Sequence, residues 1–381
     1  MIPSWYPTKD NPINGIFFME QAKALKINNV KIGVIAPIQI GVTQLVCGRP
    51  SQNRRFGVEC AVEAEIPTLR SFSLAVPMLR RFNRSMWLVQ SAKLVNEYTR
   101  LYGKPDLIHA HSNIWGGIAA NRAAHSLAVP YIVTEHSSLF ARSRLPFWQK
   151  KEISLVLQRA SAVITVSDSL RRLLIDYLPH GQIDVVPNMV DTDLFCLPEV
   201  SRKTDLFVFL TVALLNYNKG IHLLLRAFAR KFMKVAGVEL WIGGDGPQRR
   251  YLERLATELR IAGQVRFLGV LSREKVRDYM WQANAFVLPS YYETFGVVVI
   301  EAMSTGLPVI GTRCGGPEEI ITPQSGRLVP TGDIEGLADA MQLLREEYSC
   351  YSADEISRAA AERYGTTAVV DQLMNIYSRI L

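Results

Sequence analysis

The sequence predicts an α/β protein with two doubly wound domains, each a parallel sheet with helices on both faces. Its 381 residues exceed what one hydrophobic core usually organises, so two domains are expected. Short apolar runs rich in β-branched residues alternate with longer helical patterns. The runs are apolar throughout, which is typical of parallel strands covered on both faces. They form two series along the chain, and each series predicts one sheet.

The first series of expected strands fills the N-terminal half, and the second fills the C-terminal half. The first comprises residues 30–36, 107–110, 131–134, 162–166 and 183–186. The second comprises residues 207–213, 238–242, 265–268, 285–288 and 308–311. A polar, proline-bearing break at residues 193–203 separates them and predicts the linker. We therefore expect an N-terminal domain over residues 1–195 and a C-terminal domain over residues 203–365. The last segment, residues 366–381, has the apolar spacing of an amphipathic helix.

Polar residues and glycines follow these strands. They are His111, Glu135, His136, Ser167, Asn188, Glu293 and the segments 216–219, 243–246 and 315–316. Open parallel sheets bind ligands beyond the carboxyl ends of their strands. Two domains that face each other across these ends would form one ligand-binding cleft.

The positive charge of the chain is concentrated in one stretch. The net charge is +8, and between residues 49 and 104 ten basic residues stand against four acidic ones. The basic ones are Arg49, Arg54, Arg55, Arg70, Arg80, Arg81, Arg84, Lys93, Arg100 and Lys104. The apolar residues mixed with Arg80, Arg81 and Arg84 are Leu74, Val76, Met78, Leu79, Phe82, Met86 and Trp87. Two interpretations stay open: a basic helix lying on an anionic membrane, or a solvated amphipathic helix covering the N-terminal core. Nucleic acid is not an expected partner, since no motif of a nucleic-acid-binding module accompanies the charge.

Segments that would place the protein in or across a membrane are not evident. No apolar run reaches the roughly 18 residues needed to span a bilayer. The start, Met1-Ile2-Pro3-Ser4-Trp5-Tyr6-Pro7, does not resemble a secretory signal. Five scattered cysteines without a Cys-x-x-Cys pair are typical of reduced thiols that serve packing. We expect a cytoplasmic protein, peripheral on the inner face of the cell membrane if the basic helix binds lipid.

Two glutamates near the C-terminus carry the most chemical information. Glu293 lies in the loop after an expected buried strand, and Glu301 lies about two turns into the helix that the apolar run from Phe295 opens. Between them are the free backbone N–H groups of a helix N-terminus, which favour an anion. Two acceptors that flank an anion site suit a ligand with hydroxyl groups on both sides of a phosphate, such as a nucleotide sugar.

This segment resembles the retaining glycosyltransferases of family 4, which have the two-domain GT-B fold. The resemblance covers nearly the whole chain and is most specific between Lys219 and Glu319. It implies that Glu301 holds the ribose hydroxyls and that Glu293 orients the donor sugar, beside the backbone of Phe295, Gly296 and Val297. It also implies that the helix over residues 366–381 crosses back onto the N-terminal domain.

Other positions match the family's motifs one by one. Lys219, after the first strand of the second series, can reach a diphosphate as a point charge. Gly15, before an expected helix, resembles the family's N-terminal glycine loop, which touches the donor diphosphate. His136 matches a histidine that contacts the transferred sugar, and Leu271 lies in the loop whose backbone reads the base. The simpler alternatives are a loop lysine, a turn glycine and a histidine at a strand end.

The chain departs from the family pattern at two places. Leu214 stands where the family commonly has an arginine, so one cation near the departing diphosphate is missing. Either Lys219 and backbone amides suffice, or another basic side chain replaces it. Only Met1 and Ile2 precede the Pro3-Ser4-Trp5 segment, where the family usually has a full first strand.

Metal binding is not expected. His109 and His111 form a His-x-His pair, but the spacing offers no third ligand, so we expect packing for His109 and a cleft position for His111. Asp191-Thr192-Asp193 mimics the Asp-x-Asp metal motif of other glycosyltransferases, yet it matches the family's interdomain turn and is interpreted as structural. We expect no cofactor and no required metal.

The sequence thus predicts a retaining transfer of a sugar from a nucleotide diphosphate to a glycan or lipid-linked oligosaccharide, as in the synthesis of bacterial surface polysaccharides such as lipopolysaccharide. A sugar-nucleotide 2-epimerase shares the fold, but the glutamate spacing argues against it, and a glycogen-type phosphorylase would need a recognisable pyridoxal lysine. An inactive homologue that binds a nucleotide sugar is the alternative of a different class, favoured by Leu214. The sugar, the base and the acceptor stay open.

Overall fold

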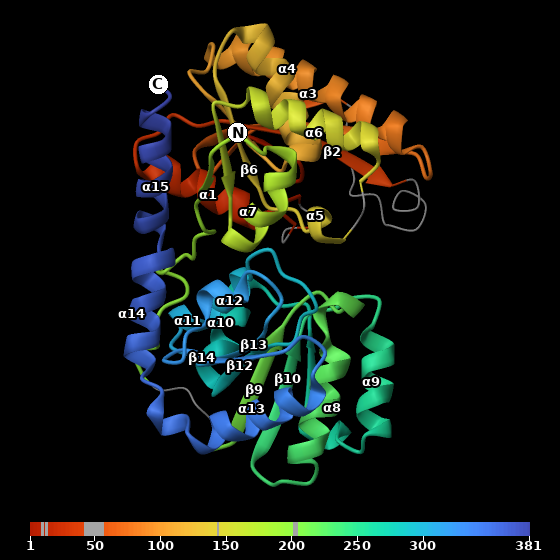
Figure 1. Ribbon diagram of the computed structural model, residues 1–381, viewed down its shortest axis with the longest axis vertical. Coiled ribbons are helices and arrows are strands. Elements are labelled where there is room, and N and C mark those ends of the chain that lie inside the picture. The colour runs from red at the N-terminus through yellow and green to blue at the C-terminus, as the bar shows by residue number, and fades with distance from the viewer. Residues whose placement is uncertain (9–10, 12–13, 42–56, 143–144, 201–204) are drawn as a thin grey trace. The chain divides into compact units, whose positions relative to one another are not determined.

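The computed structural model describes residues 1–8, 11, 14–41, 57–142, 145–200 and 205–381, without the side chains of 141–142. The chain forms two compact units (Figure 1). Unit 1 comprises Met1–Val166, Leu170–Val186 and Val370–Leu381, and unit 2 comprises Ser167–Ser169 and Pro187–Val369. Arg49, Arg54 and Arg55 of the basic stretch, Cys47, and residues 201–203 of the expected linker lie outside the described residues.

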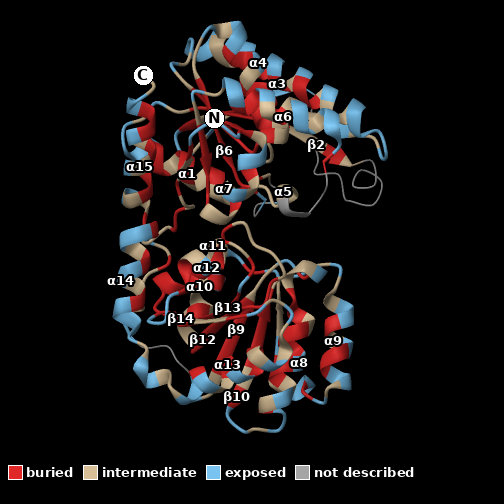
Figure 2. Ribbon diagram, viewed as in Figure 1, coloured by how far each residue is buried: buried red, intermediate tan, exposed pale blue. Residues whose placement is uncertain are grey.

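Unit 1 is built on a parallel sheet in the order β1-β5-β6-β7-β8. Its strands are β1 (Ile2–Pro3), β5 (Ile108–His111), β6 (Tyr131–Glu135), β7 (Ala162–Thr165) and β8 (Ile183–Val185). The four strands from β5 to β8 confirm the prediction to within a residue at either end. Most residues of these strands are buried, as the ribbon colours of Figure 2 show, which explains why the runs are apolar throughout.

A smaller sheet completes unit 1 and was predicted only in part. β2 (Val34–Gly41) lies parallel to β4 (Ile66–Ala75), and β3 (Val58–Glu63) pairs antiparallel with β4. The prediction placed a strand at residues 30–36, so it began too early and missed the hairpin. The β3–β4 turn is made by Ala64 and Glu65, both with positive φ. Neither residue type signals such a turn in a sequence.

The helices of unit 1 cover both sheets. They are α1 (Ile16–Ile27), α3 (Arg80–Tyr102), α4 (Ile118–Leu127), α5 (Leu139–Arg142), α6 (Phe147–Arg159) and α7 (Asp168–Leu174), with short turns at Asn113–Gly117 and Ile175–Tyr177. The basic helix begins at Arg80, so Leu74 lies in β4 instead, and Val76 and Met78 precede the helix. Trp87 faces the core of unit 1, where its indole N–H donates to the Pro37 carbonyl at 2.9 Å.

Unit 2 contains one parallel sheet in the order β11-β10-β9-β12-β13-β14. Its strands are β9 (Phe207–Val212), β10 (Val238–Gly243), β11 (Val265–Gly269), β12 (Ala285–Leu288), β13 (Val309–Thr312) and β14 (Gly326–Val329). Five of the six confirm the prediction. The edge strand β14 was missed because its sequence, Gly-Arg-Leu-Val, has neither an apolar run nor a clear alternation.

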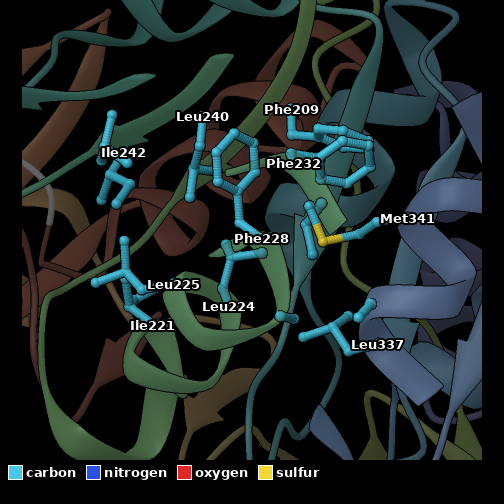
Figure 3. Close-up of a cluster of buried hydrophobic side chains, with 14 of the residues drawn as sticks. Phe209, Ile221, Leu224, Leu225, Phe228, Phe232, Leu240, Ile242, Leu337 and Met341 are labelled. Carbon is cyan, nitrogen blue, oxygen red and sulfur yellow. The ribbon is translucent and has the colours of Figure 1, made fainter. Parts of the chain in front are cut away.

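Helices lie on both faces of this sheet (Figure 1). They are α8 (Ile221–Phe232), α9 (Arg249–Glu258), α10 (Arg273–Gln282), α11 (Val297–Ser304), α12 (Pro317–Ile320), α13 (Ile334–Glu346) and α14 (Ala353–Tyr364), with short turns at Tyr217–Lys219, Ala262–Gln264 and Tyr348–Cys350. The core between the sheet and helices α8 and α13 is shown in Figure 3. There Phe209 of β9 packs on Phe228 and Phe232 of α8, with ring centres 6.5 and 5.3 Å away.

The last helix, α15 (Thr366–Ser378), begins in unit 2 and belongs to unit 1 from Val370 onward. The Tyr377 hydroxyl lies 2.7 Å from Nδ1 of His109, and Arg379 pairs with Asp184 at 3.0 Å. These contacts attach the C-terminal helix to the β5–β8 part of unit 1.

Helices long and apolar enough to cross a bilayer do not occur in the described part of the chain.

Candidate active site

Lys219 and Glu293 meet at the carboxyl end of the unit 2 sheet. Lys219 ends the turn after β9, Glu293 lies in the loop after β12, and β9 and β12 are adjacent strands. Lys219 Nζ lies 2.6 Å from Glu293 Oε1, which also accepts a hydrogen bond from the Ser290 hydroxyl at 2.7 Å. Both charged residues were expected from the sequence, whereas Ser290, two residues after β12, was not.

Backbone contacts fix the two loops to each other. The Tyr291 N–H donates to the Asn218 carbonyl at 2.8 Å, and the Asn218 side-chain amide donates to the Tyr292 carbonyl at 3.0 Å. Gly220 follows Lys219 with φ of +64°, and a Cβ there would lie 2.0 Å from the Pro289 carbonyl oxygen. A glycine is therefore required at the point where the lysine loop passes the glutamate loop.

Helix α11 presents its N-terminus between the two glutamates. It begins at Val297, two residues later than the sequence suggested, because Gly296 caps it with φ of +103°. Phe295 is buried and packs on Tyr364, so only its backbone can face a ligand. The first turn carries no acidic side chain. Its backbone N–H groups therefore keep the partial positive charge of a helix N-terminus.

Glu301, on the same helix, is almost completely buried and is paired with an arginine. Arg273 Nη1 lies 3.0 Å from Glu301 Oε1, and the Arg273 guanidinium stacks 4.9 Å from the centre of the Phe195 ring. Burial raises the pKa of the Glu301 carboxyl, and the charge and hydrogen bond of Arg273 oppose that rise. Arg273 begins helix α10 and shares no sequence motif with Glu301, so the pairing could not be predicted.

The neighbouring loops account for two further positions. Leu271, in the turn between β11 and α10, is buried, and it packs against Gly243. Its side chain is therefore used in packing, and a contact of its backbone with the base stays a prediction. Leu214, which replaces the family's arginine, is 60% exposed, so its side chain takes no part in the core.

Unit 1 carries Gly15 and His136. Gly15 caps α1 with φ of +78°, and Phe17 and Phe18 of the first turn lie 5.2 and 5.0 Å from the His136 ring. His136 follows β6 and is mostly buried. The structure thus brings the glycine loop and this histidine together within one unit.

His111, for which a cleft position was expected, is fully buried within unit 1. Its Nδ1 lies 3.1 Å from His136 Nε2, and the Phe18 ring covers it at 4.9 Å. Strands β5 and β6 are adjacent and parallel, so His111 at the end of β5 lies beside His136, which follows β6. His109 is packed, as expected, between Tyr377 and Thr134, each 2.7 Å from a ring nitrogen. Burial lowers the pKa of both His109 and His111, which keeps them neutral.

Glu135 holds the loops around these histidines and was not named as a site residue. Its buried carboxylate accepts backbone N–H groups from Asn113 at 2.7 Å, His136 at 2.9 Å and Ser137 at 2.7 Å. Desolvation raises the pKa of this carboxyl, and the three amide donors oppose the rise. Its place among the polar residues at the strand ends was the sequence signal, but that position assigned it no role.

The Asp-x-Asp segment forms a turn. Asp191 Oδ1 accepts the backbone N–H groups of Asp193 and Leu194 at 3.1 and 3.0 Å. Its carboxylate is thus used in fixing the backbone. Among the described residues, no three His, Cys, Asp or Glu side chains lie close enough together to hold a metal ion.

Comparison with known proteins agrees with this architecture. Residues 19–194 match the model "Glycosyltransferase Family 4", and residues 197–363 match "Glycosyl transferases group 1". The 2-deoxystreptamine N-acetyl-D-glucosaminyltransferase of Niallia circulans is 29% identical over 313 residues, 77% of this chain and 79% of the relative. The lipopolysaccharide core biosynthesis glycosyltransferase LpsE of Rhizobium meliloti is 38% identical over 125 residues, 32% of this chain and 35% of the relative.

Solved structures share the fold. Sucrose-phosphate synthase from Thermosynechococcus elongatus superposes with a TM-score of 0.79 at 23% identity, covering 96% of this chain and 92% of the other. Anabaena HepE in complex with UDP superposes with a TM-score of 0.76 at 19% identity, covering 99% and 98%. At these identities the likeness shows the fold, which is GT-B.

The fold and the family matches define a glycosyltransferase that uses a nucleotide-sugar donor. The chain belongs to the family 4 glycosyltransferases, retaining enzymes of the GT-B class.

Proposed function

We propose that this protein transfers a hexose from a nucleoside diphosphate to a glycan or a lipid-linked oligosaccharide of a bacterial surface polysaccharide. The observation that carries the proposal is the Lys219–Glu293 ion pair of 2.6 Å beside the N-terminus of α11. A cation, a carboxylate and a set of free amides at one sheet edge match a diphosphate joined to a sugar.

Each group has a part in the proposed reaction. Lys219, the amides from Phe295 to Val297, and the Gly15 loop stabilise the charge that develops on the departing diphosphate, the term that usually contributes most to catalysis. Glu293 orients the donor sugar, and His136 contacts its hydroxyls. Glu301 accepts the ribose hydroxyls, while Arg273 opposes the rise in its pKa that burial causes. The phosphate takes the proton of the acceptor hydroxyl as the new bond forms on the same face of the sugar.

Uracil is the base we propose first, because HepE of the same fold was solved with UDP and with UDP-glucose. The bacterial surface glycan is proposed because LpsE matches at 38% identity, although over only 32% of this chain. No metal is proposed, because lysine and amides can take over charge stabilisation at the diphosphate.

The test begins with the thermal shift of the purified protein against UDP-, GDP-, ADP- and dTDP-sugars, with Mg²⁺ and with EDTA. A ligand that binds only the folded state must raise its melting temperature. We expect one nucleotide to raise it equally in both buffers. Donor hydrolysis without acceptor should then fall about 10²-fold in Lys219→Ala and in Glu293→Ala. Lys275→Ala, which removes an exposed lysine of α10, is the matched control.

Donor hydrolysis at the wild-type rate in Glu293→Ala would contradict the proposed function. An inactive nucleotide-sugar-binding homologue is the second candidate, favoured by Leu214. It predicts a thermal shift without any donor hydrolysis, together with recovery of hydrolysis in Leu214→Arg, which restores the second cation.

A further inference from the structure

Large apolar side chains are exposed where helices α3 and α6 begin. We call residues 78–84 and 147–151 the α3–α6 tip. The exposed side chains are Met78 (97%), Leu79 (52%), Phe82 (50%), Phe147 (82%) and Trp148 (40%). Single exposed apolar residues are ordinary on a surface, but a contiguous group marks an interaction site.

The two helix starts lie side by side. The guanidinium groups of Arg81 and Arg84 on α3 stack on the Trp148 ring of α6 at 5.0 and 5.1 Å. Arg84 also pairs with Glu152 of α6 at 2.6 Å. Their exposed apolar side chains therefore form one surface.

The tip does not belong to the core of unit 1. The buried face of α3 begins further along, at Trp87 and Leu88, and continues to Leu94 and Val95. Met78 has φ of +65°, a conformation that is uncommon for a residue other than glycine. This backbone conformation is unfavourable for methionine, and the Met78 side chain is nevertheless exposed to solvent.

The tip is also strongly basic. Arg80, Arg81, Lys150 and Lys151 are exposed. The nearby acid Glu152 is already paired with Arg84. Neither α3 nor α6 has an acidic residue in its first turn, so both helix N-termini add positive partial charge. Apolar side chains among cations form a surface that suits anionic headgroups above an apolar layer.

We propose that the α3–α6 tip docks on an anionic lipid bilayer. Phe147, Met78 and Phe82 enter the boundary between headgroups and acyl chains, and Arg80, Lys150 and Lys151 contact lipid phosphates. A second copy of the chain is disfavoured as the occupant, because two surfaces of like charge repel. The proposal goes beyond sugar transfer and does not depend on it, since no residue of the tip belongs to the candidate active site.

The first experiment measures co-sedimentation with phosphatidylcholine vesicles, with and without phosphatidylglycerol. The wild type should bind only the anionic vesicles, and Met78→Ser/Phe147→Ser should lower the partition coefficient at least ~10-fold, because two apolar anchors are lost. Ile27→Ser/Val62→Ser is the control, since both positions are exposed apolar residues of unit 1 outside the tip. Because all the altered side chains are exposed, each substitution should leave the melting temperature unchanged. Measuring the melting temperature then verifies that every variant is folded.

The second experiment tests the charges. Arg80→Gln/Lys150→Gln/Lys151→Gln should bind anionic vesicles on the order of 100-fold more weakly than the wild type. High salt should cause most of the same loss in the wild type, because it screens the attraction between these charges and the lipids. Lys26→Gln/Lys31→Gln/Lys93→Gln removes the same charge elsewhere on unit 1 and should change binding far less.

Three results would overturn the proposal. One is equal binding to neutral and anionic vesicles, and another is equal loss in the tip variants and their controls. The third is a wild type that dimerises in sedimentation velocity while Met78→Ser/Phe147→Ser stays monomeric, which would assign the tip to a second copy. Donor hydrolysis is expected to be unchanged in every tip variant, so failure here leaves the transferase proposal separately testable.

Discussion

Arg273 shows how one residue can set the properties of a binding carboxylate. Glu301 is buried, and burial alone would favour its neutral form, which accepts hydroxyl groups less strongly. The guanidinium at 3.0 Å opposes this effect of burial and holds the carboxylate in an ion pair. A nucleotide ribose would therefore meet a carboxylate that is already oriented.

Arg273→Ala should weaken nucleotide binding by about tenfold, because an unpaired buried glutamate takes up a proton and loses its orientation. We expect KM for the donor to rise more than kcat falls, since the ribose is remote from the reacting bond. Isothermal titration with the nucleoside diphosphate measures the effect. Arg273→Lys, which keeps the charge but loses the planar fork and the stacking on Phe195, should be intermediate. Equal affinity in all three proteins would contradict this account.

The charged residues of the candidate site could be named from sequence, whereas their partners could not. Lys219 and Glu293 stand in loops that follow strands, Glu301 stands in the helix after the second loop, and the strands themselves were predictable. Arg273, Ser290 and Glu135 act through contacts that depend on side-chain packing. Arg273 meets Glu301 across 28 positions of sequence, and no local pattern records such a pairing.

At the scale of elements, the lysine turn and helix α8 depend on one glycine. Gly220 and Gly237 both have positive φ, of +64° and +76°. A Cβ at Gly220 would meet the Pro289 carbonyl oxygen at 2.0 Å, whereas a Cβ at Gly237 would meet nothing within 4 Å. Substituting alanine at Gly237 introduces backbone strain alone, whereas substituting alanine at Gly220 introduces both backbone strain and a steric clash.

Gly237→Ala should lower the free energy of unfolding of unit 2 by about 1 kcal/mol, the cost of a left-handed alanine. Gly220→Ala should cost at least ~3 kcal/mol, because the loop after β12 must also move. Denaturant unfolding followed through unit 2 tryptophans measures both. The same shift should displace Lys219 from Glu293 and lower donor hydrolysis in Gly220→Ala alone. Equal costs at both positions would show that the Pro289 contact yields without penalty.

At the scale of the whole molecule, the parallel sheets were predictable and the small sheet was not. Buried parallel strands have continuous apolar sequences. The structure confirms nine of the ten expected strands, β5 to β13, to within about a residue at either end. Of the β2-β4-β3 sheet only the start of β2 was expected, and the hairpin that turns through Ala64 and Glu65 has no turn signal in its sequence. The β2-β4-β3 sheet therefore depends on contacts between residues that are far apart in the sequence.

The buried histidines of unit 1 predict how the protein responds to acid. His109 and His111 have pKa values lowered below the ordinary 6.5, chiefly by burial, with the Met1 amine and His136 adding unfavourable charge. Below pH 6.5 the unfolded chain binds protons at these positions and the folded chain does not. The free energy of unfolding therefore decreases as pH falls, by up to about 1.4 kcal/mol per pH unit for each histidine once the unfolded histidine is fully protonated.

The melting temperature of unit 1 should accordingly fall between pH 6.5 and pH 5. The buried carboxyl Glu135 acts in the opposite direction, because its raised pKa lets the folded state hold a proton that the unfolded state releases. The comparison that isolates the histidine effect is thus between the wild type and His109→Gln, in which Glu135 is common to both. His109→Gln loses stability at pH 7.5 through its contacts with Tyr377 and Thr134, yet its slope below pH 6.5 should be shallower. His125→Gln/His180→Gln removes two exposed histidines and should keep the wild-type slope. A His109→Gln slope equal to that of the wild type would place the acid response in another part of the molecule.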